Sequence, residues 1–203
     1  MKLYDAPVAP NPRRVRWVMA EKGIADVEVI PVSIPDGEHK TAGYLAKAGL
    51  PQLPMLEMDD GTTITESLAI CRYLESLYPE PNLFGRDPKE TAIIEMWTRR
   101  AEMLIATPFM LGVRLSHPGF AALEAPAPEV GAWNQQAGLK ALKVLDRRLG
   151  ESAFIAADRL TIADIVAAIG IDFARIVRLR PPEELTHLNR WLTAMRERPG
   201  AKA

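Results

Sequence analysis

Residues 79–90, with the sequence PEPNLFGRDPKE, divide the chain into two parts that follow different patterns. This stretch is rich in proline and glycine and has no hydrophobic periodicity, which is typical of a linker between domains. Strand-like and helix-like segments alternate before it, and only helix-like segments follow it. The sequence therefore predicts a small α/β domain over residues 1–80, a linker over 81–87 and an all-helical domain over 88–203.

The α/β part has the predicted order strand, helix, strand, short helix, strand, strand, helix. Its strongest local signal is Asp60-Gly61 between two apolar runs, which predicts a β-hairpin. The first helix has readable ends, because Asn11 suits an N-cap, Pro12 suits the first helical position and Gly23 suits a C-terminal stop. This order indicates a mixed four-stranded sheet. The predicted elements lie at residues 2–5, 11–23, 27–32, 41–47, 55–64 (the hairpin) and 66–78.

The second part is predicted to contain helices and loops only. A long helical pattern over 88–115 is expected to bend at Pro108, because proline removes a backbone donor. The helix predicted over 160–176 begins with Thr161 as its cap and Asp164 as the reciprocal partner. That helix is apolar nearly all round, so we expect it at the centre of the domain. Further segments are a loop or broken helix over 117–131, a helix over 130–149 that ends at Gly150, and a helix over 186–198.

The composition excludes several classes of protein. The 203 residues are 48% hydrophobic, which is enough for a buried core, and a net charge of −1 offers no basic surface to nucleic acid or anionic lipid. The single cysteine, Cys71, cannot form a disulfide within the chain, which fits a reducing compartment. No secretory signal, bilayer-spanning run or cluster with metal-ligand spacing is visible. We therefore expect a cytoplasmic protein without a metal, a nucleic-acid partner or a membrane partner.

Four segments in this order are similar to the cytosolic glutathione transferase family. They are KLYDAPVAPNPRRVRWVMAEKG (2–23), QLPML (52–56), ITESLAICRYL (64–74) and DRLTIADI (158–165). The resemblance covers almost the whole chain. It implies a thioredoxin-like N-terminal domain that binds glutathione, followed by an all-helical C-terminal domain that supplies most of the pocket for a hydrophobic electrophile. It also implies a homodimer, for which residues 95–102 offer a charged and aromatic helix face.

The resemblance assigns the cysteine and the γ-glutamyl end of glutathione to residues of the first domain. Pro54 matches a cis proline of the family, and a cis bond leaves the backbone of Leu53 able to pair with the glutathione cysteine. Glu66 and Ser67 stand at a helix start, where N–H groups attract the γ-glutamyl carboxylate, and Glu66 suits the γ-glutamyl ammonium. The same two residues also suit simple capping of the helix, and both roles can coexist.

The glycine end of glutathione matches a different loop. His39 and Lys40 occupy positions that the family uses against this end, and Gln52 is a weaker candidate beside Leu53. The alternative for His39 and Lys40 is a solvated loop without a ligand.

The loop before the first helix lacks the side chain that most family members place at the glutathione sulfur. Most members have Ser, Tyr or Cys in this loop, and the resemblance puts Ala9 at the position of the serine in the Ser-type classes, so only its backbone or a water held there can act. Tyr4 in the strand and Cys71 on a helix are expected to be packing residues. Asn11 remains as a side-chain donor, and Arg14 is either a second donor or a structural charge.

Free-energy magnitudes decide whether a loop without a hydroxyl or thiol can stabilise the glutathione thiolate. Lowering a thiol pKa by about two units from its usual ~8.5 takes ~2.7 kcal/mol. A helix start typically supplies ~0.3–1 kcal/mol, and one hydrogen bond to a charged group supplies ~1.5–3 kcal/mol. The helix start together with one donor is therefore sufficient. A water held by Arg114, Ser116 or His117 is another possible donor, and these three residues are expected to line the electrophile pocket.

Three functions remain open on the sequence. In the first, glutathione thiolate attacks a small hydrophobic electrophile. In the second, the chain is a non-catalytic glutathione-binding or regulatory protein of the same fold, which Ala9 favours. In the third, it is a glutathione-dependent reductase, although the loop has no cysteine for a mixed disulfide with the protein.

Overall fold

A computed structural model describes all 203 residues, which separate into two compact units. The first unit comprises Met1–Asn82 together with Pro199–Ala203, and the second comprises Leu83–Arg198. The sequence pattern places the last five residues with the helices, whereas the structure places them with the first unit.

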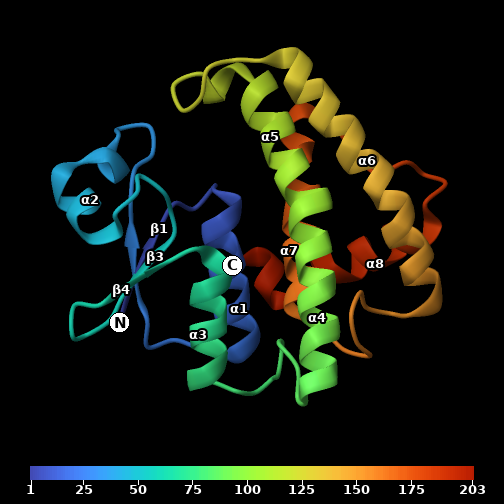
Figure 1. The fold of residues 1–203 in the computed structure, drawn as a ribbon, viewed down its shortest axis with the longest axis horizontal. Helices are drawn as coiled ribbons and strands as arrows, with labels where there is room; N and C mark the ends of the chain where they lie inside the picture. Colours follow the sequence, from blue (N-terminus) through green and yellow to red (C-terminus); the bar gives the residue numbers. More distant parts are fainter. The chain divides into compact units, whose positions relative to one another are not determined.

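The first unit is built on a four-stranded sheet with the strand order β2-β1-β3-β4. Strand β1 pairs in parallel with β2 and antiparallel with β3, and β3 pairs antiparallel with β4. Figure 1 shows α1 and α3 together on one side of this sheet and α2 on the other. This thioredoxin-like arrangement confirms the predicted element order. The bounds are β1 Lys2–Asp5, α1 Pro10–Lys22, β2 Glu28–Pro31, η1 Glu38–Lys40, α2 Ala42–Ala48, β3 Met55–Glu57, β4 Thr63–Thr65 and α3 Ser67–Leu77.

The core of the first unit forms where apolar side chains of β1, β3, α1 and α3 meet. Leu3 pairs across the sheet with Val29 and Leu56, and Leu3 and Leu56 are fully buried. Helix α1 ends at Gly23, which has a φ of 65°, a left-handed conformation that glycine adopts without steric cost. The predicted C-terminal stop of α1 is therefore confirmed.

The last residues of the chain pack against α1. The 3₁₀ turn η5 (Pro199–Lys202) places Gly200 directly against the ring of Trp17, too close for any side chain there. The Arg13 guanidinium donates a hydrogen bond to the Ala201 carbonyl at 2.8 Å and lies 5.7 Å from the Trp17 ring centroid. Trp17 is fully buried as a result.

The second unit contains only helices, as predicted. Its elements are α4 Pro88–Ala101, η2 Glu102–Ala106, α5 Thr107–Ser116, η3 Pro118–Phe120, α6 Pro128–Glu151, α7 Ile162–Phe173, η4 Ala174–Val177 and α8 Thr186–Glu197. The long pattern predicted over 88–115 is one helical path whose middle, η2, widens into a π-helix just before Pro108. Proline has no N–H to donate to the preceding turn, which accounts for the irregularity at this place.

Helix α7 is the buried centre of this unit. Thr161 and Asp164 form the predicted capping box, and the helix carries buried residues on all its faces. The predicted stop at Gly150 is wrong, because α6 continues through that residue to Glu151. A helix reaches Gly150 and passes it because a helical glycine costs only about 1 kcal/mol.

Candidate functional site

The loop between β1 and α1 is held by Arg16. Its guanidinium contacts both carboxylate oxygens of buried Asp5 at 2.6 Å and donates to the Pro7 carbonyl at 2.8 Å. A backbone hydrogen bond from Ala9 to Ala6 closes the loop. The loop therefore has a defined shape without contributing a hydroxyl or thiol.

Helix α1 begins without a side-chain cap. Its N-cap is Ala9, in an extended conformation, and its first turn contains no acidic residue. The prediction that Asn11 is the N-cap is wrong, because Pro10 already takes the first helical position and places Asn11 inside the first turn. The positive end of α1 is consequently not neutralised by any side chain of its own first turn.

Two side chains of α1 face the interior. Asn11 Oδ1 is buried and accepts no hydrogen bond within the protein. Arg14 is also buried, and its guanidinium donates to Ser67 Oγ at 3.3 Å. This hydrogen bond brings the first turns of α1 and α3 together.

Helix α3 also starts without a side-chain cap. Its N-cap residue is Glu66, which has a φ of 67° and makes no capping hydrogen bond. A positive φ is uncommon for a residue with a side chain and is concentrated at functional sites. Ser67, the first helical residue, is buried. Simple capping therefore does not account for Glu66.

The loop around His39 and the loop around Pro54 lie on either side of α2 in sequence. His39 is only 5% exposed, and its Nδ1 has no hydrogen-bond partner within the protein. Burial, together with the charge of Lys40, lowers the pKa of His39, so the ring is neutral at pH 7. Lys40 is exposed. The bond between Leu53 and Pro54 is cis, as predicted.

The sequence pattern does not predict the contact that Tyr44 makes with the loop before Leu53. The Tyr44 hydroxyl donates to the Gln52 carbonyl at 2.5 Å, directly before Leu53. The signal was present, because Tyr44 is the one aromatic residue of the short α2 segment. A pattern does not reveal which carbonyl a tyrosine hydroxyl reaches.

Cys71 and Tyr4 serve packing roles, as expected. Burial raises the pKa of the Cys71 thiol to about 12, so no thiolate forms there at neutral pH. Tyr4 packs edge-on against Tyr44 and donates to Glu57 at 2.6 Å.

The three candidate residues of the helical unit all have partners inside that unit. Arg114 pairs with Glu124 at 2.7 Å. Ser116 donates to the Gly112 carbonyl and accepts from Gln135 at 3.0 Å. His117 Nδ1 accepts from the Gly119 N–H at 3.1 Å. Any role toward a ligand requires these groups to exchange or share those bonds.

No group of three or more His, Cys, Asp or Glu side chains in the structure has an arrangement that could hold a metal ion. None of the helices is both long and apolar enough to cross a bilayer.

The glutathione S-transferase N-terminal domain model matches residues 3–82, and the C-terminal domain model matches residues 105–199. The chain belongs to the glutathione transferase family. The resemblance drawn from the sequence is thereby confirmed.

Individual relatives agree with this assignment over the full length. Glutathione S-transferase 2 of Saccharomyces cerevisiae is 36% identical over 211 residues, covering 100% of this chain and 88% of the relative. A crystal structure of a glutathione S-transferase domain-containing protein from Marinobacter aquaeolei superposes with a TM-score of 0.94 at 37% identity, covering 98% and 99% of the two chains. Maleylacetoacetate isomerase of Rattus norvegicus is 31% identical over 188 residues, and the match covers 90% of the present chain and 82% of the isomerase.

Proposed function

We propose that this protein binds glutathione in its first unit and transfers it, as a thiolate, to a small hydrophobic electrophile. The observation that carries the proposal is a pair of helix starts, α1 and α3, that both lack a side-chain cap and are joined by the Arg14–Ser67 hydrogen bond. Helix N-termini bind anions through their free N–H groups and their dipole. Of the three anionic groups of bound glutathione, the γ-glutamyl carboxylate and the thiolate suit these two helix starts.

The γ-glutamyl end is assigned to α3. Ser67 Oγ accepts from Arg14, so its own proton remains available for a ligand carboxylate. The positive φ of Glu66 turns its backbone away from helical geometry immediately before this point. Glu66 is proposed to hold the γ-glutamyl ammonium.

The remaining parts of glutathione are assigned to the two loops flanking α2. The Leu53 backbone is proposed to pair with the cysteine of glutathione. His39, Lys40 and Gln52 are proposed to hold its glycine carboxylate. The unpartnered Nδ1 of His39 supports this assignment, because a buried polar atom without a partner is costly in the absence of a ligand.

The thiolate is assigned to the start of α1. The sulfur is proposed to lie near the Ala9 and Pro10 end, where α1 has no acidic side chain to repel it. Asn11 is the proposed donor, because it lies in the first turn of α1 and its side-chain amide carries two N–H donors. The helix start and one donor together lower the thiol pKa by about two units. The thiolate then attacks an electrophilic carbon, a C–S bond forms, and the leaving group departs with the electron pair.

Calorimetry with glutathione tests the binding site. Ser67→Ala is expected to weaken affinity by about 1–3 kcal/mol, because a ligand charge loses a hydrogen bond. Ser76→Ala is the matched control, since Ser76 is an exposed serine near the other end of α3. Equal affinities for wild type and Ser67→Ala would remove the γ-glutamyl assignment.

Conjugation of glutathione to an activated aryl chloride tests the reaction. Release of chloride together with a new thioether is the expected result. Tight glutathione binding without any product, and without thiolate below pH 8, would favour the non-catalytic binding protein. Reduction of a mixed disulfide at a comparable rate would instead favour the reductase.

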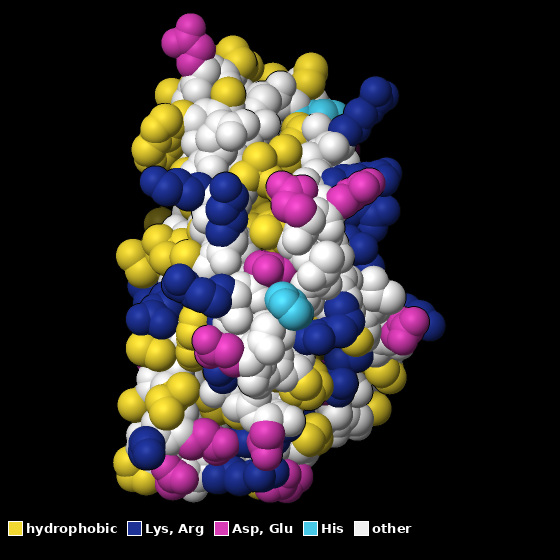
Figure 2. All heavy atoms as spheres, turned by 90° about the vertical axis from the view of Figure 1, so that its right-hand side faces the viewer, with side chains coloured by type: hydrophobic (Ala, Val, Ile, Leu, Met, Phe, Trp, Pro, Cys, Tyr) yellow, Lys and Arg dark blue, Asp and Glu magenta, His cyan; other side chains and the backbone are white.

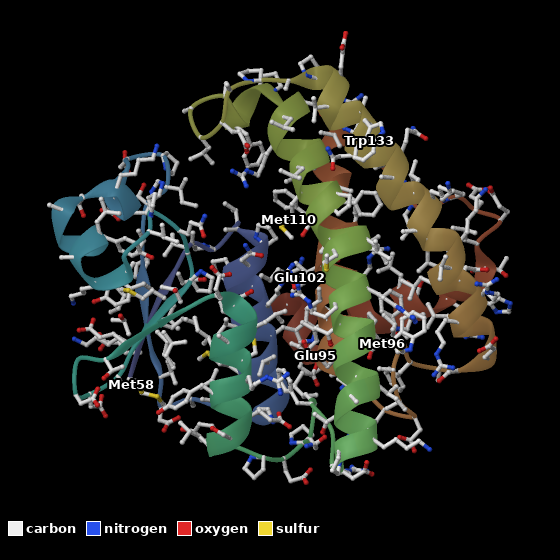
Figure 3. All side chains as sticks on the ribbon, viewed as in Figure 1. Met58, Glu95, Met96, Glu102, Met110 and Trp133 are labelled. Carbon is white, nitrogen blue, oxygen red and sulfur yellow. The ribbon has the colours of Figure 1, made fainter.

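We also propose that the protein is a homodimer formed through a groove of the helical unit. The groove has a volume of about 450 Å³ and runs between the path α4–η2 and helix α6. Trp133, which lines the groove from α6 and is labelled in Figure 3, is 70% exposed. On the face that carries α6, hydrophobic side chains emerge between lysines and arginines (Figure 2). Exposed apolar area of this kind marks interaction surfaces.

The predicted face at 95–102 borders this groove. Trp97 and Arg100 line it, with the Arg100 guanidinium 4.8 Å from the Trp97 ring centroid. Sedimentation at micromolar concentration is expected to give twice the mass of one chain. Trp133→Glu should shift the protein toward the monomer, whereas Ile176→Glu, at an exposed apolar residue outside the groove, should not. A monomeric wild type would contradict the dimer.

A further inference from the structure

We propose that the Tyr44 hydroxyl positions the Gln52–Leu53 backbone for glutathione, so that Tyr44 is a positioning residue of the binding site. The inference rests on the proposed function, because Leu53 matters only if glutathione binds beside it. The direct observation is the hydrogen bond from the Tyr44 hydroxyl to the Gln52 carbonyl at 2.5 Å.

The loop that Tyr44 holds has little else to fix it. Residues 49–52 are all exposed, so this stretch gains no rigidity from burial. Gly49 has a φ of 73°, which ends α2 and releases the chain from helical geometry. The Gln52 N–H donates to the Leu50 carbonyl at 2.8 Å, and the Gln52 carbonyl is taken by Tyr44. With both backbone groups of Gln52 engaged, the direction in which the chain enters Leu53 is set.

The ring of Tyr44 is held firmly enough to act as an anchor. Tyr44 is 7% exposed and packs in a cluster with Val32 and Met55, against which Leu53 also packs. The Tyr4 ring meets it edge-on, with the ring centroids 6.1 Å apart at an interplanar angle of 76°. The position of the hydroxyl therefore follows from the packing of the ring, not from the loop.

Helix α2, which carries Tyr44, is itself fixed to the sheet. Lys47 Nζ lies 2.9 Å from Glu57 Oε2 on β3 and 3.1 Å from the Tyr4 hydroxyl on β1. Thr63 on β4 donates to the Lys47 carbonyl at 2.8 Å. The sheet thus holds α2, α2 holds Tyr44, and Tyr44 holds the carbonyl next to Leu53.

The Tyr44 hydroxyl stays protonated throughout the pH range in which the enzyme would work. Burial, with a further contribution from Tyr4, raises the pKa of Tyr44 to about 12. Tyr44 therefore donates the same hydrogen bond throughout the pH range in which a bound thiol would ionise. A change caused by losing this bond should accordingly be independent of pH across that range.

Tyr44→Phe tests the inference, because it removes the hydroxyl and keeps the ring. We expect the KM for glutathione to rise roughly threefold to tenfold, the effect of losing one hydrogen bond that orders the site. The kcat at saturating glutathione and the KM for the electrophile should change less than twofold. A merely structural loss would lower kcat or melt the protein without this selectivity, so thermal unfolding is measured alongside.

Tyr78→Phe is the matched control. Tyr78 lies in the same unit and its hydroxyl donates to Asp26 at 2.6 Å, on an exposed site away from the Gln52 loop. This variant also loses one tyrosine hydrogen bond, and its KM for glutathione should equal that of the wild type.

The outcomes separate the two proposals. If Ser67→Ala weakens glutathione binding but Tyr44→Phe behaves like Tyr78→Phe, the positioning role is wrong and the glutathione site stands. If the wild type binds no glutathione, the proposed function fails and the inference fails with it. If Tyr44→Phe raises the KM for both substrates equally, the Tyr44 hydroxyl stabilises the fold in general and does not specifically position the Gln52–Leu53 backbone, so the positioning role is wrong.

Discussion

The start of α7 and the start of α1 are opposite solutions to the same problem. At α7, Asp164 accepts hydrogen bonds from Thr161 N, Thr161 Oγ1, Ile155 N and Trp191 Nε1 at 2.8–3.1 Å, and all of this is buried. At α1, Ala9 offers no side chain and the first turn has no acid. A helix start that the protein satisfies for itself supports the fold, whereas one left unsatisfied is available to a ligand.

The start of α4 lies between these extremes. Asp87 caps it by accepting from the Glu90 N–H at 2.9 Å, and Glu90 in turn accepts from the Arg86 N–H and from Arg159. These contacts are largely at the surface. The N–H groups at the start of α4 are therefore capped by side chains, but the cap is not buried. Four variants compare these helix starts by their effect on the free energy of unfolding or on the pKa of bound glutathione.

Asp164→Ala should have the largest effect. It leaves several buried donors without an acceptor, so unfolding free energy should fall by at least about 3 kcal/mol. The urea midpoint should then drop by about 1 M or more. Asp158→Ala is the control, because its side chain is 92% exposed and its removal should cost no more than about 0.5 kcal/mol. Equal midpoints for the two variants would show that the α7 start is not special.

Asn11→Ala should raise the pKa of bound glutathione thiol by about one unit or more, which is ~1.4 kcal/mol. Affinity for glutathione should change little at a pH below the pKa of the bound thiol, because the thiol is protonated there and the assigned contacts to the two ends of glutathione are untouched. Thiolate absorbance during a pH titration of the complex measures both the wild type and the variant. If the thiolate of the wild type persists unchanged in the variant, the donor lies elsewhere, and Arg114, Ser116 and His117 become the next residues to change.

Asp87→Ala should cost about 1 kcal/mol of stability, the usual value of an N-cap. Asp87→Ser keeps an oxygen at the cap and should retain most of that stability. Urea unfolding of the two variants gives the comparison directly. If Asp87→Ala lowers the free energy of unfolding as much as Asp164→Ala does, burial does not explain the difference expected between the caps of α4 and α7.

Ala9→Ser should have the smallest effect, because it gives α1 the kind of cap that α4 and α7 already have. The extended backbone at Ala9 suits a capping residue, so unliganded protein should gain about 0.5 kcal/mol. In the presence of saturating glutathione the gain should shrink, because hydroxyl and ligand compete for the Asn11 N–H, since Pro10 and Pro12 have no N–H. Thermal unfolding with and without glutathione measures it. An identical gain in both conditions would place the ligand away from α1.

Most of the fold can be predicted from short local patterns in the sequence. Asp60-Gly61 specifies its hairpin within a few residues, and Thr161 with Asp164 specifies a helix start in the same way, so both were predictable. Asn11 failed as a cap because two prolines flank it and Pro10 was the better first helical residue. Gly150 failed as a stop because packing overrode a weak propensity.

The candidate site was only partly predictable. The resemblance pointed to Ser67, Glu66 and Leu53 because each sits in a recognisable segment. Arg14 contacts Ser67 and Tyr44 contacts Gln52 through hydrogen bonds between elements, and no spacing along the chain encodes them. Side-chain reach across elements is a property of packing, which the sequence pattern does not contain.

The packing of residues 199–203 on α1 has a consequence for how the protein is made and handled. These residues follow the helical unit in the chain, so the first unit becomes complete only after the entire helical unit has been synthesised. A fragment cut after Asn82 would leave the Trp17 ring without the cover of Gly200 and Arg13 without the Ala201 carbonyl. Expression of the first unit alone therefore calls for a tether that returns this short segment to α1.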